Sequence, residues 1–159
     1  MYIVSLLHAL FTVSLTFYSF LFTRSKYDYL ILFIIFTMSW CWSLYRGECF
    51  ISYYLKKLND PSYEMGSNVV ADDLHVIFGD QNKEYVKFFF STIYPVGQTV
   101  NIYLLTKRNS FSSVETVLYP LVFYTYFHST FLKSSFINNC FAILFTYILY
   151  RIVKYSTFI

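Results

Sequence analysis

Apolar residues run along this chain in five long stretches, separated by short polar turns and one long polar segment. The stretches cover approximately Tyr2–Thr23, Tyr29–Tyr45, Tyr85–Thr106, Val114–Leu132 and Phe136–Tyr150. A helix needs about 17–25 mainly apolar residues to cross the hydrocarbon core of a bilayer, and several stretches reach that length. The pattern therefore predicts an all-α fold: a polytopic transmembrane helical bundle with five crossings and one long polar loop.

The predicted bundle forms a single integral membrane domain over residues 1–159. Its helices are expected near 2–23, 29–55, 85–106, 114–132 and 136–155, with the polar loop over 56–84. The second helix is extended to residue 55 because helical spacing of polar and apolar positions continues beyond Tyr45, and Pro61 then ends it. The last two stretches are short and nearly contiguous, so a four-crossing arrangement is the alternative.

Composition and charge support this interpretation. Hydrophobic residues make up 57% of the 159-residue chain and charged residues 13%, whereas soluble domains carry about 25% charged residues. With five crossings, one side collects six of the twelve basic residues, namely Arg24, Lys26, Lys107, Arg108, Arg151 and Lys154. Because basic residues near short loops favour the cytoplasmic side, the acidic loop is expected on the opposite side.

The third predicted helix carries a stripe of polar residues. Lys87, Ser91, Tyr94, Gln98 and Asn101 recur at spacings of four, three, four and three, which places them on one side of a helix. Because unpaired polar groups in hydrocarbon cost several kcal/mol, we predict that this side faces the bundle interior. Hydrogen bonding between helices explains such a stripe, and a substrate or ion path is the alternative. Pro95 inside this helix predicts a kink.

Four residues after the second apolar stretch share a helical face: Glu48, Cys49, Ser52 and Lys56. A carboxylate near the bilayer needs a partner, so we predict that Glu48 anchors the polar loop through hydrogen bonds. Lys56 reaches Glu48 only if the helix breaks at Gly47. Cys49 is expected to pack as a free, buried thiol, and His8 lies on the same side. Together Glu48, Cys49, Ser52 and His8 form the predicted loop interface, with proton handling by Glu48 and His8 as the alternative.

The sequence contains no catalytic or metal-binding motif. Its three cysteines, Cys41, Cys49 and Cys140, are odd in number and contain no CxxC, which argues against a disulfide framework and a zinc site. Gly-rich phosphate loops and GxSxG are absent, and the basic residues are scattered along the predicted membrane edges. We therefore expect no enzyme activity, no metal, no cofactor and no nucleic-acid partner.

One segment resembles a known group of proteins. It runs from Trp40 to Gly66 and includes Gly47-Glu48-Cys49, and it follows a Leu6-Leu7-His8 start. This pattern is similar to that of small polytopic membrane proteins of giant and algal DNA viruses. The resemblance covers about the first two thirds of the chain. It implies a viral membrane protein, located in a viral internal membrane or a host membrane, with no activity to carry over.

Two function classes follow. The first is a structural or interaction protein, a membrane or virion component that displays its acidic loop to a protein partner or forms a homo-oligomer in the lipid bilayer. An organelle-encoded respiratory-complex subunit in an organellar inner membrane is a variant of this class. The second is a small transporter, channel or proton-conducting subunit built around the polar third helix.

Overall fold

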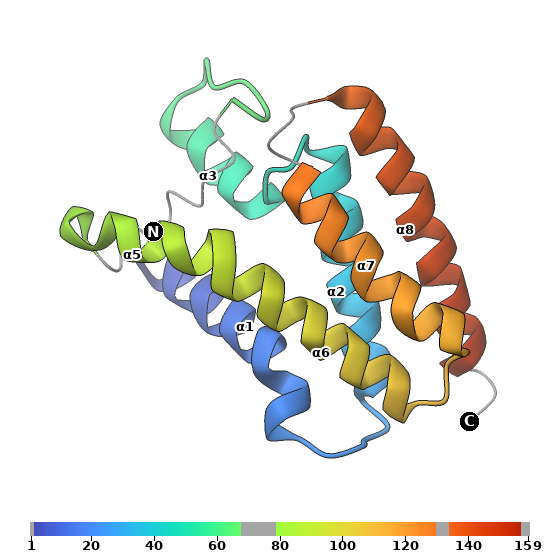
Figure 1. The fold of residues 1–159 in the computed structure, drawn as a ribbon. Coiled ribbons are helices and arrows are strands. Elements are labelled where there is room, and N and C mark those ends of the chain that lie inside the picture. Colours follow the sequence, from blue (N-terminus) through green and yellow to red (C-terminus); the bar gives the residue numbers. More distant parts are fainter. Residues whose placement is uncertain (1, 68–78, 130–133, 157–159) are drawn as a thin grey trace.

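The computed structural model describes residues 2–67, 79–129 and 134–156, and all regular structure in these ranges is helical (Figure 1). The long helices are α1 (Tyr2–Leu21), α2 (Asp28–Leu44), α6 (Tyr94–Arg108), α7 (Ser113–Ser129) and α8 (Ser135–Ser156). Shorter elements are α3 (Phe50–Asn59), the 3₁₀ turn η2 (Asp80–Asn82), α5 (Lys83–Phe88) and the π-helical turn η3 (Phe89–Ile93). Residues 68–78 of the predicted polar loop and 130–132 of the predicted fourth helix lie outside the described residues.

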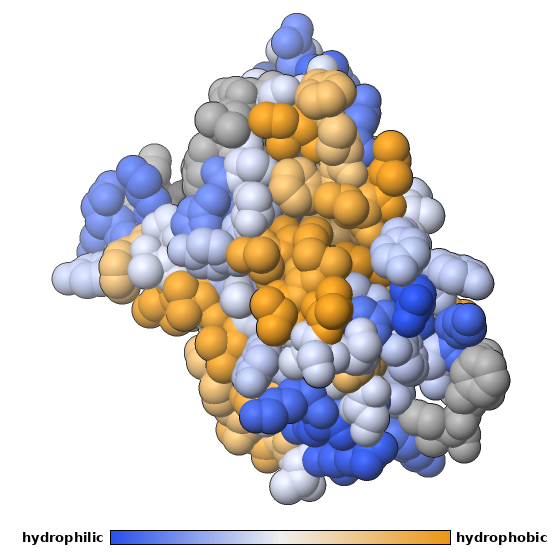
Figure 2. All heavy atoms as spheres, turned by 45° about the vertical axis from the view of Figure 1, so that its right-hand side comes forward, coloured by the Kyte–Doolittle hydropathy of each residue, from blue (hydrophilic) through white to orange (hydrophobic). Residues whose placement is uncertain are grey.

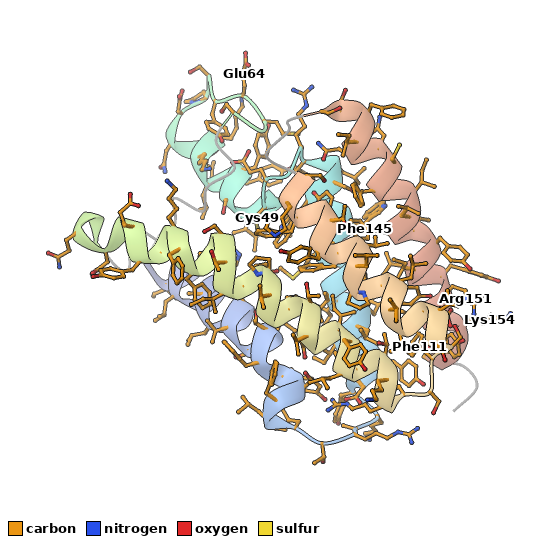
Figure 3. All side chains as sticks on the ribbon, in the orientation of Figure 1. Cys49, Glu64, Phe111, Phe145, Arg151 and Lys154 are labelled. Atoms are coloured by element: carbon orange, nitrogen blue, oxygen red, sulfur yellow. The ribbon has the colours of Figure 1, made fainter. Side chains whose placement is uncertain are left out.

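The five long helices alternate in direction along the chain (Figure 1). The α1–α2 turn, the α6–α7 turn and the end of α8 lie together at one end, which we call the basic end. The end of α2, α3 and the start of α8 lie at the other, which we call the loop end. Helix α6 packs against α1 and α7, and α2 packs against α8. Figure 3 shows Phe111, Arg151 and Lys154 at the basic end and Glu64 at the loop end.

Aromatic and aliphatic side chains fill the centre of the bundle. Phe36 of α2 contacts Phe145 of α8 and Tyr119 of α7, with ring centroids 6.0 and 5.9 Å apart. The buried cluster comprises Tyr29, Leu32, Ile35, Phe36, Tyr94, Ile102, Leu105, Phe111, Tyr119, Val122, Phe123, Tyr126, Phe145, Ile148 and Ile152. These residues come from α2, α6, α7, α8 and the α6–α7 turn, so four helices share one core.

Polar residues are unusually common in the interior. Several buried hydroxyls bond to carbonyls of their own helix: Thr16 to Thr12 at 2.7 Å, Ser39 to Ile35 at 3.0 Å and Thr106 to Ile102 at 2.9 Å. Such bonds satisfy the hydroxyl without a partner from another helix. These polar side chains are thereby accommodated in the interior of the bundle.

Large apolar side chains cover the outside of the long helices. Ile143 of α8 is 72% exposed, and Ile3 and Val114 are 71% exposed. Figure 2 shows a broad apolar area on the side that carries α8, with hydrophilic residues gathered below it. The largest exposed apolar patch of a typical soluble monomer is only about 300–600 Å² and is often functional. Large apolar side chains are therefore found on the outside of the bundle as well as in its core.

One helix in the described part of the chain, α8, is by length and composition suited to cross a membrane on its own. Two further apolar helical segments, Ser5–Leu21 and Asp28–Leu44, are shorter than α8. A core helix of a soluble protein also passes such a test, but it would be mostly buried. Only 28% of the apolar window of α8 is buried inside the bundle.

The predicted second helix was too long. It ends at Leu44 rather than at residue 55, because Arg46 and Gly47 take φ angles of 55° and 86°. The Gly47 amide bonds the Trp42 carbonyl at 2.7 Å, an i to i−5 closure typical of a helix C-terminus. A separate helix, α3, begins at Phe50. Helix α3 extends to Asn59, into the start of the predicted polar loop, and α5 begins at Lys83, two residues before the predicted third helix.

Candidate functional site

Glu48 lies at the centre of a buried polar cluster at the loop end. Its side chain is 1% exposed. Oε1 accepts hydrogen bonds from Lys56 Nζ at 2.9 Å and from the Tyr63 hydroxyl at 2.8 Å, and Oε2 accepts one from the Gly66 amide at 3.1 Å. Two of these donors belong to the segment that follows α3. Glu48 thus ties this segment to the turn after α2, which is the geometry predicted for a loop anchor.

The local sequence explains why this cluster forms. The break at Gly47 turns the chain, so Lys56 of α3 reaches Glu48 although the two would lie far apart on a continuous helix. Gly66 has φ +78°, and an added Cβ would lie 2.8 Å from the Cβ of Arg46. Only glycine fits this close approach without strain. Lys57 Nζ adds a hydrogen bond to the Tyr63 carbonyl at 3.0 Å.

Cys49 and His8 connect α1 to the same turn. Cys49 is a free, half-buried cysteine, and its Sγ lies 3.7 Å from Nε2 of His8. Burial raises the pKa of the Cys49 thiol, but the contact with His8 and the backbone amides of Ser52 and Ile51 outweigh burial and hold the pKa below its usual value. Ser52 is buried in α3. The four predicted interface residues therefore gather around one turn.

Three of the five predicted stripe residues face the interior. Tyr94, Gln98 and Asn101 are buried, whereas Lys87 is exposed and Ser91 is partly exposed. The prediction was wrong for Lys87 and Ser91 because Lys87 precedes the π-helical turn η3 and Ser91 lies within it. A π turn holds one extra residue, which rotates the preceding residues by about 100°. The wider turn directly precedes Pro95, whose missing amide hydrogen interrupts the helical hydrogen bonds.

Asn101 joins α6 to the backbone of α1. Its Nδ2 donates to the Leu15 carbonyl at 2.7 Å, and its Oδ1 accepts from the Ser19 amide at 2.9 Å. These two backbone groups are four residues apart and would bond each other in a regular helix. Asn101 therefore pairs with another helix as predicted. Gly97, one turn earlier, allows the close approach, since an added Cβ would lie 3.0 Å from Thr16 Cγ2.

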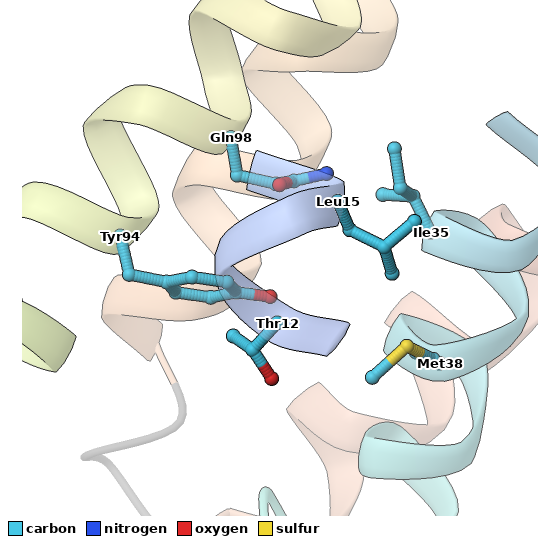
Figure 4. A pocket seen from close by; sticks show the side chains of 6 residues that line it. All are labelled: Thr12, Leu15, Ile35, Met38, Tyr94 and Gln98. Atoms are coloured by element: carbon cyan, nitrogen blue, oxygen red, sulfur yellow. The ribbon is translucent and has the colours of Figure 1, made fainter. Parts of the chain in front are cut away.

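Gln98 lines a small cavity between α1, α2 and α6 (Figure 4). The lining residues are Thr12, Leu15, Ile35, Met38, Tyr94 and Gln98. The volume of this cavity is about 10 Å³, enough for about one molecule of water. Gln98 is 1% exposed, and its Oε1 has no hydrogen-bond partner. Gln98 is interior as predicted, but its carbonyl oxygen lacks the expected pairing.

Two buried ion-pair clusters at the basic end were not predicted as pairs. Asp28, at the start of α2, is fully buried. Arg108 Nε and Nη2 each donate a hydrogen bond to one of its carboxylate oxygens at 2.7 Å. Asn109 Nδ2 donates a third bond at 2.7 Å. Arg108 Nη1 also donates to the Phe22 carbonyl at 2.6 Å. We call this the Asp28 cluster; it joins the α1–α2 turn to the end of α6.

The second cluster centres on Glu115 at the start of α7. Its carboxylate accepts bonds from Ser112 Oγ at 2.6 Å, the Tyr119 hydroxyl at 3.0 Å and the Tyr155 hydroxyl at 2.7 Å. Arg151 Nη2 lies 2.8 Å from Oε1. In both clusters an acid in the first turn of one helix meets an arginine from the last turns of another, as helix dipoles favour. In the sequence, the only indication of these pairs was the position of the acids at helix starts and of the arginines near helix ends.

Comparisons with family models, with curated proteins and with solved structures find no match to this chain. The resemblance to viral membrane proteins therefore stays a prediction from the sequence.

Proposed function

We propose that this chain is a multi-pass integral membrane protein with a structural or interaction role. In this proposal α1, α2, the helix over 83–108, α7 and α8 cross the bilayer. The observation that carries it is the distribution of side chains: large apolar residues cover the outside of the long helices, while carboxylates and amides lie inside. Exposed apolar surface is unfavourable in water, whereas in hydrocarbon lipid covers it.

The buried charges support the membrane setting. Asp28, Glu48 and Glu115 are all buried, and each accepts several hydrogen bonds and pairs with a cation. Ionisable residues in membrane proteins face the bundle interior and pair with one another, because a charge exposed to lipid is costly. All three acids belong to helix starts or to a turn, so they lie near the expected membrane edges.

Helix lengths fit the proposed crossings. At 1.5 Å per residue, the 22 residues of α8 span about 33 Å, and the 17 residues of α2 or α7 span about 25 Å. The hydrocarbon core is about 30 Å thick, so α2 and α7 are at the lower limit. The alternation of five helices supports five crossings over four. The gathering of basic residues at one end supports its cytoplasmic placement.

The structural role is favoured over transport because the polar interior is largely used in holding helices together. Asn101 bonds α1, and the Glu48, Asp28 and Glu115 clusters tie turns and helix ends. The segment after α3 keeps Asp60 and Glu64 exposed, and we propose it as the surface offered to a protein partner. The membrane stays as the sequence predicts it, a viral internal or host membrane, with an organellar inner membrane as the variant.

One observation favours the transport alternative. The cavity beside Gln98 brings an unpaired carbonyl oxygen, the Tyr94 side chain and Thr12 together inside the bundle. A proton-conducting role would require this cavity to connect to both sides through water. Proteoliposomes with an entrapped pH dye test it directly: Gln98→Leu should abolish any flux that passes through the cavity.

The membrane proposal is tested by cysteine accessibility. All three native cysteines are replaced by serine, and single cysteines are placed at Ser67 and Ser110. In sealed vesicles, an impermeant maleimide should label the two positions from opposite sides, because they lie at opposite ends of the bundle. Labelling of both from the same side, or release of the protein from membranes by alkaline carbonate, would refute the proposal.

A further inference from the structure

Three free cysteines give this chain three candidate thiols in different settings. Cys41 lies inside α2, Cys140 is exposed on α8, and Cys49 stands at the turn before α3. Exposure alone would rank Cys140 as the most accessible. The surroundings of Cys49 give it a property that exposure does not provide.

Cys49 has a base within reach and lies at the start of a helix. Nε2 of His8 lies 3.7 Å from Sγ. Cys49 is also the N-cap residue of α3, with φ −66° and ψ 129°. Its side chain makes no capping hydrogen bond, and the amides of Ser52 and Ile51 lower the pKa of the thiol. An imidazole and helix-start amides both stabilise a thiolate, and these are the surroundings in which reactive cysteines occur.

The cavity beside Gln98 is lined by two residues that lie on the same face of α1 as His8. His8, Thr12 and Leu15 are spaced four and three residues apart, so they share a face of α1, and the last two line the cavity. Tyr94 also lines the cavity and interacts electrostatically with Cys49. The buried Gln98 Oε1 in this cavity has no donor. An acceptor of this kind favours a small molecule with an O–H group over an apolar one.

We propose that Cys49, with His8 as its proton acceptor, is a modification site that reacts with small hydroperoxides to form a sulfenic acid. The thiol transfers its proton to Nε2 of His8, and the sulfur attacks one peroxide oxygen. The S–O bond forms as the O–O bond breaks, and the leaving hydroxide takes the proton from His8 to give water. Sulfur loses two electrons and the peroxide gains them, so hydrogen peroxide and the thiol yield Cys49–SOH and one water.

The modification would act on the anchor at the loop end. The Sγ–Nε2 contact joins α1 to the turn that carries Glu48, so an added oxygen on the sulfur alters the contact between these two elements. The inference does not depend on the proposed membrane role, because it uses only contacts within the bundle.

The test compares three full-length proteins in detergent, each retaining one of the three cysteines and carrying serine at the other two. Each is exposed to hydrogen peroxide with dimedone, and the labelled fraction is measured by mass spectrometry over time. We expect Cys49 to be labelled about tenfold faster than Cys140 despite the greater exposure of Cys140. Labelling of Cys140 at an equal or higher rate would overturn the proposal.

Two variants examine the role of His8. In the protein that retains only Cys49, His8→Gln should slow labelling about tenfold, whereas His128→Gln, an exposed histidine on α7, should leave the rate unchanged. An unchanged rate in His8→Gln would refute the pairing.

If His8→Gln does not fold, the pH dependence of the rate of Cys49 alkylation is measured in the protein that retains His8. The groups facing Cys49 are His8, Cys41 and Tyr94. Because the pKa of Cys49 is lowered, its rate of alkylation by iodoacetamide should reach a plateau at lower pH than that of the same protein unfolded in urea. A midpoint at or above that of the unfolded protein would overturn the proposal.

Discussion

The two ends of the bundle hold buried carboxylates in different ways. At the basic end, Asp28 and Arg108 are 80 residues apart in sequence, and Glu115 and Tyr155 are 40 apart. At the loop end, Glu48 takes its partners from residues 8, 15 and 18 positions later. The basic end therefore joins separate long helices, whereas the loop end folds a local segment onto a turn. We therefore predict that substitutions at the basic end destabilise the whole bundle, whereas substitutions at the loop end loosen only the segment after α3.

The largest effect is expected from Arg108→Ala. This change leaves Asp28 buried without its bidentate partner, and breaking a buried pair in this way costs about 3–5 kcal/mol. Thermal unfolding in detergent should show one cooperative transition at clearly lower temperature. Lys107→Ala is the control, since Lys107 is exposed and should change stability by less than about 1 kcal/mol. Equal losses of stability in the two variants would contradict a stabilising role for the Asp28 cluster.

A smaller and local effect is expected from Glu48→Ala. Loss of the acceptor releases Tyr63 and Gly66, at a cost of about 1–3 kcal/mol. Limited proteolysis should cut faster within residues 60–67, while the thermal transition moves less than in Arg108→Ala. Glu48→Gln keeps an acceptor for the Tyr63 hydroxyl and should retain most of the protection. Equal cleavage of wild type and Glu48→Ala would rule out the anchor.

Gly66→Ala sharpens the same point with a backbone change. Both Gly66 and Gly79 have positive φ, so alanine at either costs about 1–2 kcal/mol in conformational energy. Only at Gly66 would the new Cβ also meet Arg46, at 2.8 Å. We therefore expect Gly66→Ala to increase cleavage of residues 60–67 and Gly79→Ala to leave it unchanged. The reverse order would show that close packing of Gly66 on Arg46 does not hold the segment.

The smallest effects concern the interior between the two ends. Asn101→Leu should cost about 0.6–2 kcal/mol because it removes two bonds to the α1 backbone. Gln98→Leu should change stability by less than about 0.5 kcal/mol, because Gln98 Oε1 has no partner to lose. Denaturation in mixed micelles compares the two variants. A larger loss for Gln98→Leu would mean that the cavity contributes more to stability than the Asn101 bridge.

The positions of helices were predicted well where a long apolar stretch defines the helix. The predicted 136–155 matches α8 within one residue at each end, and 2–23 ends two residues beyond α1. The break at Arg46 and Gly47 was missed because the residues after it keep helical spacing, so periodicity alone favoured continuation. The π turn before Pro95 was missed because nothing in residue spacing distinguishes an i to i+5 turn. It moved Lys87 and Ser91 off the predicted face.

The candidate site was partly predictable for a similar reason. Glu48 was identified from its place just after the second apolar stretch, and its partners lie nearby in sequence. Arg108 and Asp28 were assigned to one side by topology, but their pairing depends on how α6 packs beside the α1–α2 turn. The contact of His8 with Cys49 likewise spans 41 residues. Long-range contacts of this kind follow from packing, which a single sequence does not specify.

The Asn101 bridge limits how the bundle can move. Sliding α1 past α6 by one helical turn, about 5.4 Å, would break both bonds to Asn101 and leave its buried side-chain amide without partners. We therefore expect α1 and α6 to resist sliding past each other. The α2–α8 pair meets through rings such as Phe36 and Phe145, which can shift without breaking hydrogen bonds. We therefore expect any sliding between helices to occur at the contact of α2 with α8 rather than between α1 and α6.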